Sequence, residues 1–592
     1  MNCGQGPYMV IGIDFGMTCT GVAFSQAPRW SDPKTFQQWT SFISELANKV
    51  PSKVAYTTAT NELQSWGLYC NQEDNRTIVQ ELFKLNLDPE YHDPYEYAPT
   101  TEQARNWYFD YLRYVHDHIV QHFLCRVPQW TSAPIEFVFS VPTTWRNPKM
   151  VADIEMIIRS AGFGRDGPLH SACVTLNEAE AAAVAVARQH LAFNDVLMVC
   201  DAGGGTSDVS ILKLCSHPGE ATKLVPLVPV EGGWFGSALI DMRAQQLLIE
   251  RLSRISTYLQ ISPHEAAQQM IEGRFERFKC SFGAEGSDIP TLPLKVPGIP
   301  AGSYFPEVGI INSQMIITRE ELQNMFDEQV NGIINLIDSQ LQKLIQYQES
   351  DQVSFLVLSG GLGASPYLRR RIIYHFQGGA GRVHQNSQSI KVILAEQPQL
   401  AVVHGLVAER TQMVTQGVVA IRERRSRLSY GVVCDQTYRE QKHLGEHVVR
   451  DPRDGKRWAK AQIEWIIKQG DKVPTEGVAK EFRAKIQRTQ VNYPWKAQIV
   501  MSSYVAEQLP PSMAHEGVTT LCIVESNLSG VKMKAKNQHW WNSKKKHSMA
   551  EFALKVIPGS ADIKFQLWSD QRMISKDHQN LEILWDDTQQ TD

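Results

Sequence analysis

The sequence lacks several features that mark particular classes of protein. No two of its ten cysteines form a C-x-x-C pair, and several lie inside apolar segments, where cysteine behaves as a small hydrophobic residue. This pattern favours reduced thiols in the cytosol or nucleus. No apolar run is long enough to cross a bilayer, and residues 1–6 lack the charged-then-apolar layout of a signal peptide. We therefore expect a cytoplasmic protein with no membrane span.

The chain also lacks an excess of charge of one sign. Its formal net charge is −4, with 43% hydrophobic and 21% charged residues. Without a basic excess to attract phosphate backbones, nucleic acid is an unlikely general partner. There is no low-complexity tract and no short-period repeat. At 592 residues, the chain exceeds the size of one hydrophobic core and should form several domains.

The pattern of the chain changes near residue 412. Strands and amphipathic helices alternate through residues 1–412, which predicts an α/β domain. Helices are expected at residues 102–125, 237–260 and 263–282, and a capping box from Thr318 to Glu321 opens a further long helix. Residues 413–592 instead carry short alternating segments separated by Pro, Gly, Asn and Asp, which predicts a β-rich domain with strands at residues 428–434, 497–502, 519–524, 552–557, 563–568 and 581–585.

One turn signature occurs twice in the first domain. Residues 13–24 (IDFGMTCTGVAF) and residues 200–212 (CDAGGGTSDVSIL) both give a strand, an Asp-x-Gly turn and a second strand. Glycine allows the backbone to turn tightly and to approach a ligand, and successive N–H groups in such a turn form an anion site. An Asp at the strand end can hold a divalent cation, usually through water. Two facing copies would hold the phosphates of one nucleotide.

Three further segments follow in a fixed order. Residues 135–142 are an apolar strand that ends at a proline, and residues 176–183 lead from a strand into an Ala-rich helix. Residues 355–366 are a strand, a glycine turn and a helix start, where bare backbone can pass beneath a base and ribose.

Together these residues resemble the actin-like ATPase superfamily and, within it, the 70-kDa heat-shock protein (chaperone) family. The closest fit is the atypical branch in animals and fungi that lacks the usual peptide-binding C-terminal half. The resemblance covers about residues 8–410. It implies a duplicated ATPase domain of two lobes and four subdomains, with ATP or ADP and Mg²⁺ in the central cleft.

The resemblance also implies roles for individual residues. Asp14, Glu178 and Asp201 would hold Mg²⁺ through water. Glu178 would position the attacking water, while Lys84 would stabilise the transferred phosphoryl group. Asp201 and Thr206 would complete the catalytic set. The remaining nucleotide contacts would come from Gly16, Met17, Thr18, Gly203, Gly204, Gly205, Thr206, Glu276, Lys279, Gly360 and Gly361.

The sequence departs from the family pattern at several positions. Met17 replaces a hydroxyl residue that contacts phosphate, which would slow hydrolysis, and Ala179 replaces a proline. Leu362 and Ala364 replace polar residues of the adenosine turn, and the family's acidic and leucine-containing linker is absent. The resemblance therefore implies ATP binding more strongly than ATP hydrolysis, and it implies peptide refolding least of all.

Three functions follow as alternatives. The first is a slow Mg²⁺-dependent ATPase whose nucleotide state controls the C-terminal module, acting as a monomer on a protein client or with a co-factor. The second is a nucleotide-gated scaffold with negligible hydrolysis. The third is a small-molecule kinase of the same superfamily, although the chain has no obvious acceptor-site base.

Structural explanations compete with some of these assignments. Lys84 taken alone would be a solvated lysine, and Glu276 with Lys279 would be a helical ion pair. Residues 532–546 mix lysine with tryptophan and could meet nucleic acid or anionic lipid, but a lysine-protected edge strand explains them better.

Overall fold

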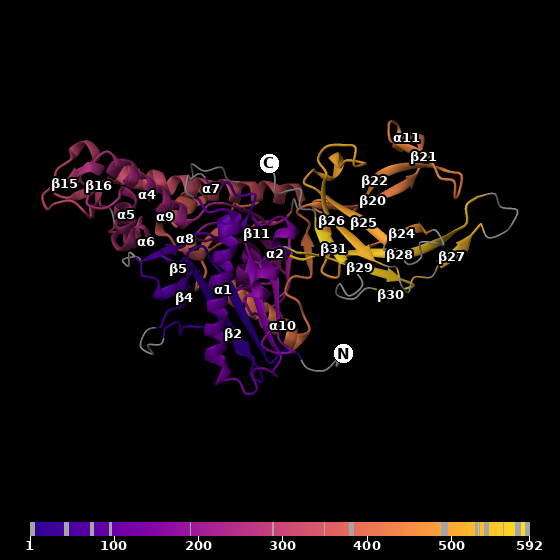
Figure 1. The fold of residues 1–592 in the computed structure, drawn as a ribbon, viewed down its shortest axis with the longest axis horizontal. Helices are drawn as coiled ribbons and strands as arrows, with labels where there is room; N and C mark the ends of the chain where they lie inside the picture. The colour runs from indigo at the N-terminus through magenta and orange to yellow at the C-terminus, as the bar shows by residue number, and fades with distance from the viewer. Residues whose placement is uncertain are drawn as a thin grey trace. The chain divides into compact units, whose positions relative to one another are not determined.

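The computed structural model describes residues 6–40, 46–71, 76–93, 98–189, 191–286, 289–347, 350–377, 384–486, 495–526, 528, 531, 533–537, 544–560, 562–574 and 582–585. It is a mixed α/β structure with two compact units (Figure 1). The first comprises Met1–Arg146 and Ile154–Ala420, and the second Asn147–Asp153 and Ile421–Asp592. Residue 412, where the sequence pattern changes, lies within helix α10 (Ala401–Gln416).

The first unit contains a sheet with the strand order β3-β2-β1-β8-β9, and β4 also pairs with β2. Strands β1 and β2 form an antiparallel hairpin, whereas β1, β8 and β9 are parallel. Every residue of β1 and β8 is buried, as expected of strands covered on both faces. The strands are β1 (Met9–Phe15), β2 (Cys19–Gln26), β3 (Lys34–Thr35), β4 (Lys49–Pro51), β8 (Ile135–Val141) and β9 (Ser171–Asn177).

A second sheet in this unit repeats that arrangement. Its order is β12-β11-β10-β17-β18, again with an antiparallel hairpin, β10–β11, followed by parallel neighbours. Strand β13 also pairs with β11. The strands are β10 (Val196–Ala202), β11 (Ser207–Leu214), β12 (Leu224–Pro226), β13 (Glu231–Gly233), β17 (Phe355–Ser359) and β18 (Lys391–Leu394).

Two helices connect the halves of the first unit. Helix α3 (Glu178–Ala187) follows β9 and packs against α10, which follows β18. A Cβ atom at Gly405 would lie 1.8 Å from the carbonyl oxygen of Ala181, so only glycine permits this approach. Helix α10 also contacts β1, β2 and β8 of the first sheet. The Ala-rich segment therefore serves close helix packing.

The other helices surround the sheets. Helix α1 (Thr101–Leu124) agrees with the predicted helix, and α7 (Arg319–Tyr347) begins at the predicted capping box, where Thr318 and Glu321 exchange hydrogen bonds of 2.8 and 3.2 Å. The remaining helical segments of the unit are η1 (Gly67–Tyr69), η2 (Leu85–Leu87), η3 (Ser256–Tyr258), η5 (Pro306–Val308), α8 (Gly360–Gly363) and α9 (Pro366–Gln377), while the residues of α2 (Pro148–Ser160) are divided between the two units.

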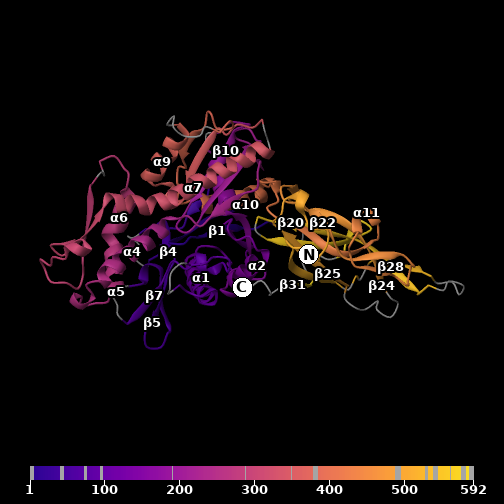
Figure 2. The ribbon, with the colours of Figure 1, turned by 90° about the horizontal axis from the view of Figure 1, so that it is seen from above.

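The two helices expected between residues 237 and 282 are more broken than predicted. Helix α4 (Ser237–Ser253) ends early, and α5 (Pro263–Met270) passes through a π-helical turn (Ile271–Phe275) into α6 (Glu276–Ser281). These helices lie together in both views (Figures 1 and 2). Two small sheets complete the unit: β5 (Val54–Thr57), β6 (Leu63–Trp66) and β7 (Thr77–Gln80), and β14 (Thr291–Lys295), β15 (Ile310–Ile311) and β16 (Gln314–Thr318).

The second unit consists mainly of two antiparallel sheets. One has the order β21-β22-β20-β25-β26-β31, and the other β24-β28-β29-β30 with β27 also on β28. Alternate residues of β28 and β29 are buried, and residues of both sheets, such as Ile499 and Leu554, share one core. Outside these sheets lie β19 (Glu423–Arg425), β23 (Lys472–Pro474) and α11 (Glu440–His443).

The β-rich prediction for this segment located six strands and missed several others. The two long ones that it missed, β22 (Arg457–Ile467) and β24 (Val478–Ile486), carry many charged, partly exposed side chains and lack a clean apolar alternation. The other strands of the two sheets are β20 (Ser429–Thr437), β21 (Val448–Arg450), β25 (Trp495–Ser502), β26 (Thr519–Ser526), β27 (Met533–Lys536), β28 (His547–Pro558), β29 (Ile563–Ser569), β30 (Arg572–Met573) and β31 (Glu582–Trp585).

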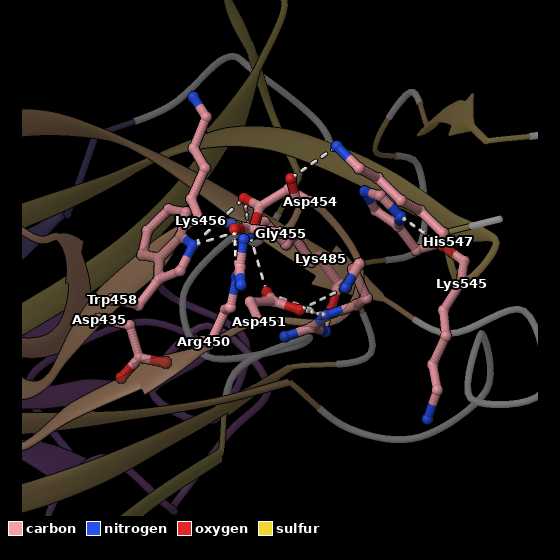
Figure 3. Close-up of polar contacts among 12 residues, drawn as sticks. Asp435, Arg450, Asp451, Asp454, Gly455, Lys456, Trp458, Lys485, Lys545 and His547 are labelled. Carbon is pink, nitrogen blue, oxygen red and sulfur yellow. Dashed lines mark hydrogen bonds and ion pairs between the residues drawn. The ribbon is translucent and has the colours of Figure 1, made fainter. Parts of the chain in front are cut away.

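A partly buried polar cluster joins the β21–β22 turn to β24 in the second unit (Figure 3). Lys485 donates to Asp451 at 2.8 Å and to Asp454 at 2.6 Å, and its ammonium group lies 3.9 Å from the ring centroid of Trp458. Arg453 donates to both oxygens of Asp451. Lys485 is therefore paired on two sides and stacked on a third.

Strand β27 supports the edge-strand interpretation of the lysine-rich segment. It carries Lys534 and Lys536 and pairs with β28. Trp540 and Trp541, which suggested lipid or nucleic acid, lie outside the described residues.

Candidate functional site

A cavity of about 410 Å³ opens in the first unit where the two hairpins meet. All fifteen residues predicted for the site line it. They are Asp14, Gly16, Met17, Thr18, Lys84, Glu178, Asp201, Gly203, Gly204, Gly205, Thr206, Glu276, Lys279, Gly360 and Gly361. Segments separated by more than 300 residues are therefore brought together around one space.

The two hairpin turns pack directly against each other where they line this cavity. A Cβ atom at Gly204 would lie 3.0 Å from the Cβ atom of Met17, and one at Gly205 would lie 3.2 Å from the Met17 sulfur. The backbone N–H groups of Ser237 and Ala238, at the start of α4, donate to the carbonyls of Gly203 and Gly204. These bonds fix the second turn from behind.

Four carboxylates gather where strands of the two sheets end. Asp14 and Asp201 are the next-to-last residues of β1 and β10, Glu178 follows β9, and Asp208 is near the start of β11; all four are buried. Burial, followed by the charge of Glu178, raises the pKa of Asp201 to about 7 and raises the pKa of Asp208 well above its ordinary value. Ligands of α/β sheets commonly bind at such strand ends.

Two lysines oppose these acids. Lys84, directly before η2, donates to Glu178 Oε1 at 2.6 Å and to the carbonyl of Phe15 at 2.6 Å. Burial raises the pKa of Glu178, and the Lys84 ammonium opposes that shift. Lys49, on β4, lies 3.1 Å from Asp14 Oδ2. When all four acids are ionised, the two lysines leave the group with a formal charge of −2, and a divalent cation would favour that ionised state over the protonated one that burial favours.

Asp208 is held by the segment that follows β8. The backbone N–H of Thr143 donates to Asp208 Oδ1 at 3.2 Å, and the Thr143 hydroxyl donates to the same oxygen. This contact links the proline turn after β8 directly to the second hairpin.

The opposite end of the cavity is less charged. Lys279 of α6 pairs with Asp241 of α4, rather than with Glu276 as the helical spacing suggested. Burial raises the pKa of Asp241 to about 6, while Lys279 opposes that shift. Gly360 adopts a φ of 82°, and a Cβ atom there would lie 2.2 Å from the carbonyl oxygen of Ala202. Only glycine therefore fits at this point of the wall.

Met17 belongs to a small apolar cluster between the two hairpins. Its buried side chain packs with Leu85, which follows Lys84, and with Ala238 of α4. Tyr91 adds to this cluster and contacts the ring of Trp234 with a centroid distance of 5.4 Å. The residue that departs from the family pattern thus fills an apolar contact between the two halves.

Sequence reasoning missed three charged residues of the site. Asp208 had a signal, since an acid inside an apolar strand is costly to bury without a partner. Asp241 lies one helical turn after Ser237, and both line the cavity, but nothing in α4 alone indicates this. Lys49 reaches the cavity through strand pairing, so it has no local signal.

The residues of the cavity fit a hydrated divalent cation rather than a directly bound one. Within the described ranges, no three His, Cys, Asp or Glu side chains are arranged to hold a metal ion directly. Asp201 Oδ1 is nevertheless buried, and no hydrogen-bond partner for it occurs in the described part of the chain. Such an oxygen can accept a hydrogen bond from metal-bound water.

One comparison with known protein families bears on the chain. A profile described as a domain of unknown function (DUF8568) matches residues 424–587. The match lies within the second unit and includes none of the residues that line the cavity. Among the described helices, none combines the length and apolar character that a bilayer span requires.

Proposed function

We propose that the first unit is an actin-like ATPase domain, related to the 70-kDa heat-shock protein family, that binds ATP in the cavity between its two hairpins. The observation that carries the proposal is the meeting of both turns and all fifteen predicted residues around one cavity. The repeated sheet order supports a duplicated domain.

The turns supply the groups that phosphates need. Backbone N–H groups at residues 16–18 and 203–206 would contact the β- and γ-phosphates, and the Thr206 hydroxyl would donate to the γ-phosphate. The bare backbone at Gly360 and Gly361 would support the nucleoside.

The acids and lysines supply the remaining chemistry. Asp201, with Asp14 and Glu178, would hold hydrated Mg²⁺, which neutralises phosphate charge when bound. Glu178 would orient the attacking water, and Lys84 would stabilise charge on the transferred group. Nucleotide state would then control the second unit.

A second candidate is a nucleotide-gated scaffold with negligible turnover. Two observations favour it. Lys84 and Glu178, two of the four side chains assigned to catalysis, are paired with each other, and Met17 brings an apolar side chain to the phosphate turn.

Calorimetric titration of the full chain with Mg·ATP tests binding. We expect a dissociation constant in the micromolar range or below, weakened at least ten-fold by Asp201→Ala and unchanged by Glu220→Gln at an exposed site. Absence of binding to the wild type would remove the proposal.

A single-turnover assay separates the two candidates. Phosphate release that collapses in Asp201→Ala supports the ATPase, whereas tight binding without release supports the scaffold. ADP formation that depends on an added sugar or carboxylate would instead indicate a kinase.

A further inference from the structure

Lys49 reaches the cavity by crossing a neighbouring strand. In the sheet register, Lys49 of β4 pairs with Gly21 of β2, and Gly21 pairs with Asp14 of β1. A Cβ atom at Gly21 would lie 3.1 Å from Lys49 Cε, so the lysine stem runs over the space that glycine leaves empty. The Cα atoms of Lys49 and Asp14 therefore lie two strand spacings apart, about 10 Å, and the two side chains together close this gap.

Strand β4 is firmly attached to the first hairpin. The backbone N–H of Ser52 donates to the carbonyl of Thr18 at 2.9 Å, and the hydroxyls of Ser52 and Thr20 lie 2.9 Å apart. Lys49 is therefore placed by the same backbone that forms the phosphate turn.

The acids of the two hairpins have different surroundings. Asp14 Oδ2 accepts a hydrogen bond from Lys49 at 3.1 Å, and Asp14 Oδ1 accepts one from the Ser140 hydroxyl at 3.4 Å. Asp201 Oδ1, by contrast, has no partner among the described residues. The duplicated turns are thus unequal: the first acid is already neutralised by the protein, and the second is not.

We propose that Lys49 is a resident cation of the phosphate end of the cavity, which makes ATP binding largely independent of divalent metal and leaves Asp201 as the main carboxylate for Mg²⁺. An ammonium group has three N–H donors, and Asp14 takes one of them. Because Lys49 lines the cavity, the others are available to phosphate oxygens. The inference rests on the proposed nucleotide site.

Titration of the full chain with ATP in EDTA, and again with excess Mg²⁺, tests this role. For the wild type, we expect Mg²⁺ to tighten ATP binding by less than ten-fold. Lys49→Gln should weaken binding in EDTA at least ten-fold, so that the Mg²⁺-dependent gain rises to about 100-fold. Lys34→Gln, at an exposed lysine on β3 of the same sheet, should change neither value.

Three further variants make the result decisive. Lys49→Arg keeps the charge and should bind ATP in EDTA within about three-fold of the wild type, which separates a charge effect from misfolding of Lys49→Gln. Asp201→Asn should reduce the Mg²⁺-dependent gain more than Asp14→Asn does. If Asp201→Asn and Asp14→Asn reduced the Mg²⁺-dependent gain equally, this result would contradict the asymmetry between the two hairpins.

The outcomes separate this inference from the function on which it rests. If ATP binds neither with Mg²⁺ nor in EDTA, the nucleotide site itself is wrong. If Mg·ATP binds but ATP in EDTA does not, or if Lys49→Gln leaves binding in EDTA unchanged, the nucleotide site stands and the role of Lys49 is overturned.

Discussion

Lys84 Nζ lies 2.6 Å from Glu178 Oε1, and both side chains are almost fully buried. The two residues are 94 positions apart in the sequence, and both lie in the first half of the unit. A buried carboxylate without a partner destabilises the folded protein. The pair should therefore contribute both to the stability of the unit and to the proposed hydrolysis.

Replacement of Lys84 by methionine should therefore affect both stability and turnover. We expect the free energy of unfolding to fall by about 3 kcal/mol, since Glu178 loses its buried partner. Single-turnover phosphate release should fall about 100-fold, the size expected for loss of one charged group at a transition state. Chemical denaturation and quenched-flow assays measure the two effects, with Lys34→Met as the control. Unchanged phosphate release would show that Lys84 is structural only.

Two adjacent glycines should respond differently to alanine. Gly360 has a φ of 82° and no room for a Cβ atom, whereas a Cβ atom at Gly361 would meet nothing within 4 Å. Gly360→Ala should destabilise the first unit by about 2 kcal/mol or more, and Gly361→Ala by less than about 0.5 kcal/mol. Thermal unfolding measures both. Equal effects would contradict a left-handed Gly360 pressed against the backbone of β10.

Stability should fall as the pH rises past the pKa of an ordinary histidine. Burial lowers the pKa of His116, but hydrogen bonds to Asp166 and Asp117 outweigh burial, so that folding raises this pKa. A raised pKa gives a contribution that is complete below about pH 6.5, the unfolded value, and is lost as the pH rises through the folded value.

The measurement is the melting temperature at pH 6 and at pH 8.5. The drop between these values should be about 2 °C larger for the wild type than for His116→Asn, which lacks the titrating group. His217→Asn, at an exposed histidine, should behave as the wild type. A larger drop in His116→Asn than in the wild type would mean that folding lowers the pKa of His116 instead of raising it.

In the second unit, two lysines of β24 offer a matched comparison. Lys485 is only 11% exposed and pairs with both Asp451 and Asp454, whereas Lys480 pairs with Glu464 at the surface. Lys485→Met should destabilise the unit by about 2 kcal/mol, because two carboxylates lose a shared partner. Lys480→Met should cost less than about 0.5 kcal/mol. Differential scanning calorimetry of the full chain measures both, and similar losses would exclude the cluster in Figure 3 as a stabilising feature.

Much of the candidate site could be predicted because its parts carry local signals. Glycine turns at strand ends and acids beside apolar runs are visible in a single sequence, and they identified Asp14 and Asp201. The capping box at Thr318 likewise identified the start of α7. These features depend on backbone geometry over a few residues.

The rest depends on pairing between distant segments. Lys49 enters the cavity only because β4 pairs with β2 beside a glycine. Lys279 pairs with Asp241 and not with Glu276, the partner that helical spacing suggested. Strands β22 and β24 were missed because their charged side chains lie on exposed faces or in internal ion pairs. In each case, the deciding neighbour is far away in the sequence.

The contact between Gly405 and Ala181 has a mechanical consequence. Because backbone meets backbone at this crossing, no side chain is present there to change rotamer and absorb a displacement. Helices α3 and α10 can therefore rotate about this contact as a pivot. The same contact sterically blocks one helix from sliding along the other. Any widening of the cavity at the two hairpins should then occur by rotation about this pivot, and the atoms farthest from the pivot should move most.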